Sequence, residues 1–227
     1  MTDVHESDLA NPGLAKALHR LGALKRLPRT GWLDRGISSE ETESVADHSL
    51  RVALLAWLAA LDDPSLDHGR VLELALLHDV PEYGAGDIPP YDPADLDAAA
   101  GDPAFLDRRH RRSPERQAAK RAAEQEAMDA LLADLPPAAR SVLAARWEEL
   151  RDGTSPEARF VSQADKLETY LQSREYAATR PGLAIGSFAA EVAEVITHPA
   201  LVALRDAIAQ MDVSPETTAA DDASGTG

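Results

Sequence analysis

The sequence predicts a single domain built almost wholly from α-helices. Its 227 residues can bury one sizeable core, and because 44% are hydrophobic but only 4% aromatic, alanine and leucine must supply most of it. Apolar residues recur at helical spacing, and proline, glycine and Ser-Pro-Glu signals divide this pattern into separate helices. We expect a flexible leader over residues 1–13, one helical domain over 14–211 and a disordered acidic tail over 212–227.

The first helix is expected after the polar leader, because Leu14, Ala17, Leu18, Leu21 and Leu24 repeat at helical spacing before Pro28. The next segment places several basic residues around the ring of Trp32. A charge cluster of this kind is usually a solvated surface. Because it precedes a possible ligand-bearing helix, Arg29 stays open as an anion-binding residue.

A second helix is predicted from Ser44, an N-cap with Asp47 in capping-box position, to about Leu61. His48 falls on its apolar stripe. A lone histidine there is more often a hydrogen-bonded core residue than a ligand, and both interpretations stay open. The Asp67-His68-Gly69 sequence is typical of a solvent turn, and we assign His68 no function.

The stretch around which the chain is organised is Val71–Pro90, which reads VLELALLHDVPEYGAGDIPP. Its apolar start predicts a helix that carries His78, Asp79 and Glu82 along one edge. The proline and glycines that follow let the chain turn so that Asp87 points back at the same spot. The alternative is that His78, Asp79 and Glu82 are simply charged residues at the end of a helix. The apolar run before the pair carries His78 inward, however, where an unpaired charge is costly, and imidazole with carboxylate suits a divalent cation.

Residues 91–112 lack clear periodicity and are expected to form a mobile loop beside this site. The basic run from Arg108 to Arg121 is expected to be a solvated face, with phosphate contact as the less favoured alternative. Ser-Pro-Glu signals at 113–115 and 155–157 predict helices reaching about Asp134 and about Ala178, with a shorter helix between them ended by Gly153 and closing helices over 183–196 and 199–211.

Asp165 lies beside the apolar stripe of the helix predicted after Ser155. A carboxylate at such an edge is usually salt-bridged, and Lys166 or Arg174 is the expected partner. A buried acid is also a fair candidate for a metal ligand, so both roles stay open.

Composition excludes several classes of function. The absence of cysteine excludes disulfides and thiolate ligands, which leaves histidine and carboxylates for a metal. A net charge of −16 argues against a nucleic acid polymer as partner. No long apolar run, export signal or lipidation pattern indicates a membrane, so a cytoplasmic location is expected. A small anionic substrate would need local positive charge from a metal and a few arginines.

The order His48, then His78-Asp79, then Asp165, each on a separate predicted helix, resembles the H…HD…D arrangement of the HD-domain metal-dependent phosphohydrolases. Four blocks, KRLPRTGW, ESVADHS, ALLHDVPE with GDIP, and EARFVSQADKLE, are similar to landmarks of the HD-domain 5′-deoxynucleotidases. This likeness spans about Leu14–Pro199 and implies an HD-domain helical bundle. The VPEYGAG sequence and the arginine-rich insert near 101–112 depart from the family pattern. These departures concern the expected wall of the nucleoside pocket and leave the expected metal ligands unchanged.

The resemblance also implies a role for each site residue. The principal divalent ion, Mn²⁺, Co²⁺ or Mg²⁺, would be held by His48, His78, Asp79 and Asp165. The catalytic acids would be Glu82 and Asp87, which could also hold a second ion with the carbonyl of Ile88. Arg29 and Trp32 would line the phosphate pocket. Asp47 is a guess for the acceptor that orients a histidine ligand.

The implied activity is hydrolysis of a deoxynucleoside 5′-monophosphate by a homodimer, with exposed apolar stripes expected on the closing helices Leu183–Met211. Two alternatives remain. The substrate could be another phosphomonoester or a nucleotide analogue, or the chain could be a nucleotide-binding HD module without turnover. Intact Glu82 and Asp87 argue against the last of these.

Overall fold

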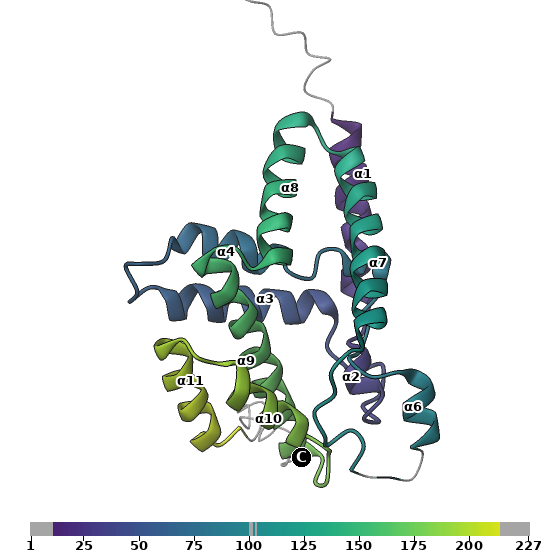
Figure 1. Cartoon of the computed structure of the whole chain (residues 1–227), viewed down its shortest axis with the longest axis vertical. Helices are drawn as coiled ribbons and strands as arrows, with labels where there is room; N and C mark the ends of the chain where they lie inside the picture. Colours follow the sequence, from purple (N-terminus) through teal and green to yellow (C-terminus); the bar gives the residue numbers. More distant parts are fainter. Residues whose placement is uncertain (1–10, 100–101, 103, 214–227) are drawn as a thin grey trace, which may run out of the picture.

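The computed structural model describes residues 11–99, 102 and 104–213 (Figure 1). Within them the regular structure is helical, apart from one isolated bridge between Pro28 and Ser44. The elements are α1 (Pro12–Leu21), the 3₁₀ helix η2 (Gly22–Arg26), α2 (Thr30–Leu33), α3 (Val45–Ala60), α4 (His68–Leu77), α5 (Glu82–Ala85), α6 (Pro93–Ala98), α7 (Pro114–Asp134), α8 (Pro137–Asp152), α9 (Pro156–Thr179), α10 (Gly186–Val195) and α11 (Pro199–Gln210). The predicted all-α fold class is confirmed. No described helix is both long and apolar enough to cross a membrane.

Helix starts follow the capping residues closely. The Ser44 side chain accepts a hydrogen bond from the Asp47 amide while the Asp47 carboxylate accepts from the Ser44 amide, which completes the predicted capping box of α3. The side chains of Ser113 and Ser155 cap α7 and α9 by accepting from the Arg116 and Ala158 amides, and each serine is followed by a proline in the first turn. Gly153 ends α8 in the left-handed conformation, with φ of 59°.

Two predicted boundaries differ from the structure. Asn11 caps α1 through the Leu14 amide, so this helix already begins at Pro12, while residues 1–10 of the predicted leader and 214–227 of the predicted tail lie outside the described residues. The solvent turn expected at 67–69 is wrong. The Asp67 side chain accepts from the Arg70 amide and starts α4, because aspartate at a turn and at an N-cap gives the same local signal.

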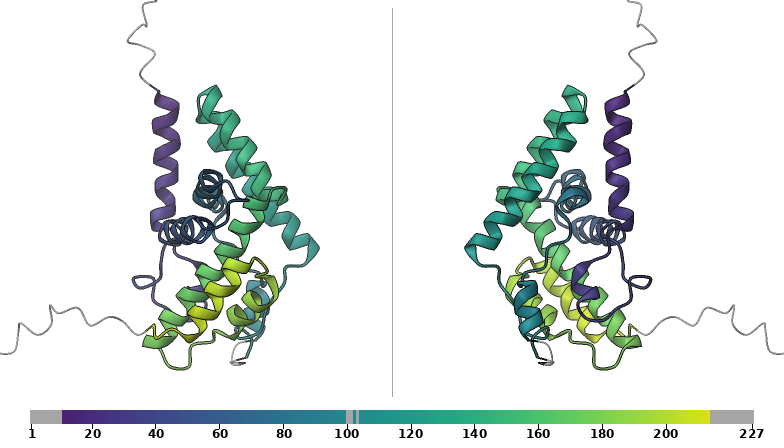
Figure 2. Two further views of the ribbon diagram at one scale, coloured as in Figure 1. Left: turned by 90° about the vertical axis from the view of Figure 1, so that its left-hand side faces the viewer. Right: turned by 90° about the vertical axis from the view of Figure 1, so that its right-hand side faces the viewer.

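The helices form two groups (Figure 1). α1, α7 and α8 stand together and enclose a core that includes Ala17, Met128, Leu131 and Trp147. α3 and α4 pack side by side, seen nearly end-on in Figure 2, and α9 crosses both. The larger core lies between them and α11, and includes Val52, Leu74, Phe160, Leu167 and Leu201. The two groups contact each other where α8 packs against α4 and α9 and where α5 packs against α7.

The segment expected to be an irregular loop is partly ordered by local packing. Its described residues include α6, and the rings of Tyr91, Phe105 and His110 contact one another, edge to face or tilted, at centroid distances of 4.3–5.8 Å. Tyr91 also donates a hydrogen bond to Asp34, 2.8 Å away. These aromatic residues were too widely spaced in the sequence to show periodicity.

The prediction of exposed apolar stripes on the closing helices is also wrong, because the large side chains of α10 and α11 pack against α9. The main exposed apolar stripe lies instead on α3, with Leu50, Leu54, Trp57 and Leu58 on the outer surface and Leu61 just after its end. Their spacing of three to four residues places them on one face of this helix.

Candidate metal centre

His48, His78 and Asp165 come together from α3, from the end of α4 and from α9. The Nε2 atom of His48 lies 3.4 Å from Nε2 of His78 and 3.2 Å from Oδ1 of Asp165. The ligand-capable atoms of all three residues lie within 4.8 Å of one another, as a shared metal ion requires. The structure therefore brings together three of the four ligands expected from the sequence in one small volume.

Asp79 completes the expected set. Its Oδ2 atom lies 3.3 Å from Nε2 of His78 and 3.6 Å from Nε2 of His48. The same oxygen accepts a hydrogen bond of 3.0 Å from Nη1 of Arg29. Burial acts to raise the pKa of Asp79, but His78, Arg29 and His48 outweigh it and hold this pKa well below its ordinary value. The carboxylate is thus in the ionised form that a metal ligand needs.

Both histidine rings are turned so that Nε2 faces the cluster. Nδ1 of His78 lies 2.7 Å from the Ala75 carbonyl, to which only a protonated Nδ1 can donate. Nδ1 of His48 contacts the carboxylate of Glu168, and both side chains are fully buried. Glu168, and not Asp47, is therefore the acceptor that orients His48, since the Asp47 carboxylate is used in the helix cap.

The electrostatics of His48 indicate that the site favours a positive charge. Burial and Arg29 act to lower its pKa, but hydrogen bonds to Asp165 and Glu168 outweigh them and raise the pKa to about 10. A divalent ion beside Nε2 would satisfy the same carboxylates, with the ring neutral. Two imidazoles and two carboxylates are a donor set suited to Mn²⁺, Co²⁺ or Zn²⁺, and the residues present fit such an ion.

Asp165 lies at the edge of this cluster and keeps a cationic partner. Nζ of Lys166 lies 2.9 Å from its Oδ2 atom, whereas Arg174 donates to the Met211 carbonyl. Of the two partners expected from the sequence, Lys166 is the correct one. Because Oδ1 points at His48 and Oδ2 at Lys166, a salt bridge and a ligand role are compatible in one carboxylate.

Glu82 lies next to the cluster at the start of α5 and is only 4% exposed. Its Oε1 atom is 3.8 Å from Nζ of Lys120, while Oε2 is buried without a hydrogen-bond partner among the described residues. Burial, followed by the charges of Asp79 and Asp87, raises the pKa of Glu82 well above its ordinary value. The structure thus provides a desolvated carboxyl group with one free oxygen beside the metal ligands.

Asp87 points back toward the same place, as the glycines before it predicted. Its Oδ2 atom accepts a hydrogen bond of 2.6 Å from the Thr30 amide, and its carbonyl accepts one of 2.7 Å from the Thr30 hydroxyl. Its Oδ1 atom lies 3.8 Å from Nη1 of Arg29. Gly86, with φ of 79°, makes this turn in a conformation that residues with a Cβ rarely adopt.

Arg29 and Trp32 occupy different environments. Arg29 reaches the cluster and its pKa is raised, because Asp87 and Asp79 outweigh the effect of burial. Trp32 contributes to the cavity wall but is only 2% exposed, and it donates to Oε1 of Glu43 at 2.8 Å. Its ring packs against Phe188 at a centroid distance of 4.9 Å. These contacts make Trp32 a support of the wall, with little surface available to a ligand.

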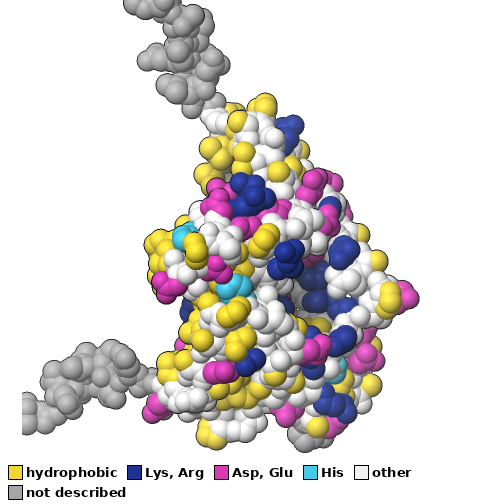
Figure 3. Space-filling view, turned by 60° about the vertical axis from the view of Figure 1, so that its left-hand side comes forward, with side chains coloured by type: hydrophobic (Ala, Val, Ile, Leu, Met, Phe, Trp, Pro, Cys, Tyr) yellow, Lys and Arg dark blue, Asp and Glu magenta, His cyan; other side chains and the backbone are white. Residues whose placement is uncertain are grey.

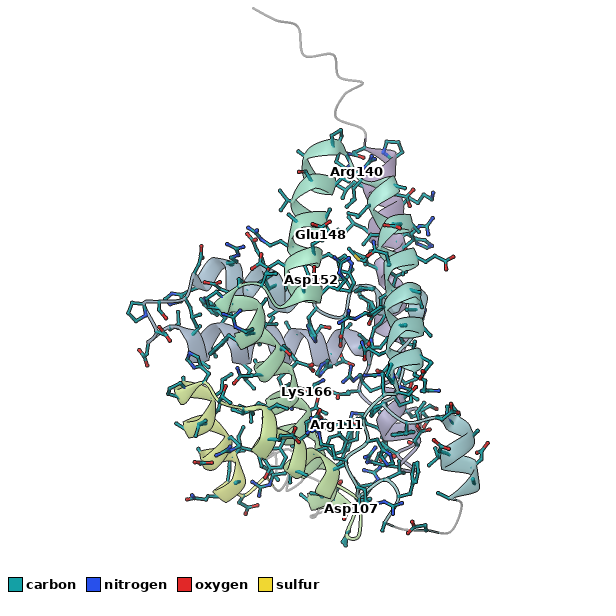
Figure 4. All side chains as sticks on the ribbon, in the orientation of Figure 1. Asp107, Arg111, Arg140, Glu148, Asp152 and Lys166 are labelled. Atoms are coloured by element: carbon teal, nitrogen blue, oxygen red, sulfur yellow. The ribbon has the colours of Figure 1, made fainter. Side chains whose placement is uncertain are left out.

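A cavity of about 600 Å³ opens above the cluster, large enough for a small-molecule ligand. Among the described residues, nine lysine and arginine but only six acidic side chains line it, in a chain whose net charge is −16. Lys and Arg side chains gather around a hollow in Figure 3. Lys166 and Arg111, labelled in Figure 4, reach this cavity from α9 and from the segment before α7. The cavity therefore supplies the local positive charge that an anionic ligand needs.

The basic run was predicted to be a solvated face, which holds for Arg108 and Arg111, whose side chains are exposed. Arg109 and Arg112 are instead partly buried, and all four arginines line the cavity. The sequence alone also gave no role to Lys120 or Glu168. Glu168 could have been found from its position three residues after Asp165 on the same helix. Lys120 carries no comparable signal, because it is one of several basic residues on α7.

Comparison with known proteins shows the family to which the chain belongs. The sequence profile of the HD domain family matches residues 21–198. The 5′-deoxynucleotidase HDDC2 of Mus musculus is 36% identical over 194 residues, which cover 85% of this chain and 84% of that protein. The 5′-deoxynucleotidase hdd1 of Schizosaccharomyces pombe is 35% identical over 160 residues, covering 69% and 68%.

The fold is also found among solved structures. The PH0347 protein of Pyrococcus horikoshii OT3 superposes with a TM-score of 0.62 at 25% identity, over 86% of this chain and 97% of that one. The family match over residues 21–198 and the relatives at 35–36% identity establish the family. The chain is a member of the HD domain family, in the group that includes these 5′-deoxynucleotidases.

Proposed function

We propose that this protein is a metal-dependent 5′-nucleotidase that hydrolyses deoxynucleoside 5′-monophosphates to nucleoside and phosphate. The observation that carries the proposal is the juxtaposition of His48, His78, Asp79 and Asp165 beside Arg29 in a cavity lined by cations. A dianionic phosphate needs such a site in a chain with net charge −16. Relatives at 35–36% identity that carry the name 5′-deoxynucleotidase supply the substrate class.

The residues of the cluster would hold a divalent ion, with Mn²⁺ or Co²⁺ as the leading candidates and Mg²⁺ as a third. When bound, such an ion acts as a Lewis acid toward the phosphate and makes water acidic enough to attack near neutral pH. Glu168 and the Ala75 carbonyl keep both imidazoles turned toward it, so little reorganisation accompanies binding.

Arg29 would balance charge on the phosphate. Its guanidinium lies between Asp79 and Asp87, and it carries donors beyond the one that contacts Asp79. A guanidinium held in this way is oriented before the substrate arrives, which is the arrangement that stabilises charge developing in a transition state.

Glu82 would hold the proton that the leaving 5′-oxygen needs. Its Oε2 atom is buried beside the cluster without a hydrogen-bond partner among the described residues, so it is available to a group in the cavity. Asp87 is engaged by Thr30 and is better suited to fix the loop that carries it than to transfer a proton. Ile88 would present an apolar surface to the sugar.

Assembly and location are further parts of the proposal. We propose a homodimer, and the exposed stripe of α3 at Leu50, Leu54 and Leu58 is the surface that favours it. The cytoplasmic location expected from the sequence stays a prediction.

The experiment that tests the function is phosphate release from ribo- and deoxynucleoside 5′-monophosphates with Mn²⁺, Co²⁺ and Mg²⁺ in turn. We expect activity that is lost in chelator and restored by Mn²⁺ or Co²⁺. Full turnover in a metal-stripped sample would contradict the metal centre. Release from other phosphomonoesters alone would change the substrate class, and no release from any would favour a binding module.

A further inference from the structure

Glu82, Asp87 and the Ile88 carbonyl, which were expected to hold a second metal ion, already face hydrogen-bond donors or cations of the protein. The Ile88 carbonyl accepts a hydrogen bond from Nη2 of Arg112. Of the two Asp87 carboxylate oxygens, one accepts from the Thr30 amide and the other faces Arg29 at 3.8 Å. A divalent ion bound here would have to displace these donors or lie directly against their charges.

The third member of that group is in the same situation. Oε1 of Glu82 faces Nζ of Lys120 at 3.8 Å, which leaves only Oε2 without a partner among the described residues. A hard cation needs several oxygen ligands at once, and one free oxygen does not provide them. Glu82, Asp87 and Ile88 thus do not fit a second ion while Arg112 and Lys120 remain in place.

Arg112 differs from its basic neighbours in lacking an acidic partner. Within the described part of the chain no carboxylate lies within ion-pair distance of it, whereas Arg109 and Arg111 both pair with Glu194 and Arg116 pairs with Asp92. Its one hydrogen bond goes to a neutral carbonyl, and its Nε atom is buried with no acceptor among these residues. A half-buried guanidinium with unused donors is an anion-binding group.

The position of Arg112 suits a phosphate at the metal centre. It lines the same cavity as His78, Asp79 and Asp165. Ile88, which holds it, directly follows Asp87, and Asp87 is bound to Thr30, the residue next to Arg29. Arg29, which precedes the Asp87–Ile88 turn in the sequence, and Arg112, which follows it, therefore both lie beside this turn.

We propose that Arg112 binds the substrate phosphate, its guanidinium taking the place at the Ile88 carbonyl that a second metal ion would need. The site would then work with one metal ion and two arginines. The inference rests on the proposed nucleotidase function for the identity of the phosphate, but its test does not depend on turnover.

The test uses the full chain loaded with Mn²⁺, with inorganic phosphate as the probe. Elemental analysis should give one ion per wild-type chain. Calorimetry should show phosphate binding weakened about tenfold to a hundredfold in Arg112→Met, the scale of one hydrogen bond between charged groups. Arg121→Met is the matched control, because it removes the same charge from α7 outside the cavity wall, and it should stay within about twofold of wild type.

Arg112→Gln separates binding from folding. Glutamine keeps an N–H donor for the Ile88 carbonyl but loses the charge, so the segment stays anchored while phosphate affinity falls as in Arg112→Met. Two ions per wild-type chain, or wild-type phosphate affinity in the folded Gln variant, would overturn the inference. If Arg112 variants lose phosphate affinity but wild type releases phosphate from no nucleotide, the proposed function fails and the inference stands.

Discussion

The carboxylate of Glu168 lies against Nδ1 of His48, 120 residues earlier in the chain, and both side chains are completely buried. The other oxygen of Glu168 accepts from Nε of Arg51 at 2.6 Å. This pair joins α3 to α9 at the point where both helices supply candidate metal ligands. Orientation of His48 and cohesion of the two helices therefore depend on the same carboxylate.

Replacing Glu168 with Gln should weaken metal affinity by about tenfold to a hundredfold, because the amide no longer fixes the His48 ring with a charged acceptor. A chelator competition titration measures this. Glu175→Gln is the matched control, since Glu175 also pairs with Arg51 but does not touch a histidine. Equal metal affinity in both variants would show that Glu168 has no orienting role.

Asp165→Ala and Glu82→Ala should differ in metal content. The first removes a proposed ligand and should lower metal occupancy. The second should retain the metal and lose turnover by about a hundredfold or more, the scale of one general acid or base. Elemental analysis beside steady-state kinetics distinguishes them, and the reverse pattern of metal loss would exchange the two roles.

Deoxyribonucleotides should be preferred over ribonucleotides by about tenfold to a hundredfold in kcat/KM. The reason is that an apolar surface such as Ile88 rejects an added hydroxyl only weakly. The bases should be discriminated poorly. Kinetics with dAMP, AMP, dCMP and CMP measure this preference, and equal rates for both sugar types would indicate a general phosphomonoesterase.

Replacing Leu54 with Lys should convert the expected homodimer to a monomer, because it places a charge in the exposed apolar stripe of α3. Light scattering at micromolar concentration gives the molar mass. Val142→Lys places the same charge on the exposed surface of α8 and should leave the mass unchanged. A monomeric wild-type chain would contradict the dimer without affecting the chemistry.

Glu149→Gln should lower the free energy of unfolding at pH 7 by about 1–2 kcal/mol, because Arg70 binds both Glu149 oxygens, at 2.8 and 2.6 Å, but is itself partly exposed. Although burial acts to raise it, hydrogen bonds from Arg70 and Ser155 lower the pKa of Glu149.

The lowered pKa of Glu149 makes the destabilisation by Glu149→Gln depend on pH. Since the folded pKa lies below the unfolded value, about 4.3, the stabilisation is complete above the unfolded pKa and is lost as pH falls through the folded one. Denaturant unfolding should therefore show the difference between wild type and Glu149→Gln shrinking below about pH 4. Glu148→Gln, on the exposed side of α8 (Figure 4), is the control and should leave the free energy of unfolding at pH 7 close to that of wild type.

The sequence predicted the helices because their starts depend on local signals, and it named the four residues that the fold brings together as a proposed metal site. Capping residues placed the starts of α3, α7 and α9, and the residue types and order of His48, His78, Asp79 and Asp165 identified the site. What it did not predict depends on pairing across the fold. Nothing near Arg112 indicates that its partner is the Ile88 carbonyl, 24 residues away.

The same limit explains two errors. A buried carboxylate behind His48 was expected from the adjacent Asp47, but the acceptor is Glu168 on another helix. Exposed apolar residues were expected on the last helices, but α10 and α11 pack against α9, and the exposed apolar stripe lies on one face of α3. Which face of an amphipathic helix is covered depends on its neighbours.

The bridge between Pro28 and Ser44 has a consequence for how the site could change in evolution. The Arg29 amide donates to the Glu43 carbonyl at 3.1 Å and the Val45 amide to the Leu27 carbonyl at 2.9 Å, so Arg29 is fastened to the first turn of the helix that carries His48. These hydrogen bonds hold the two ends of the segment between Arg29 and Glu43 together. Its exposed tip at Ser38–Glu40, just before the Glu41 carbonyl that accepts from Tyr176 of α9, can therefore change in length or sequence while the spacing between Arg29 and His48 is inherited unchanged.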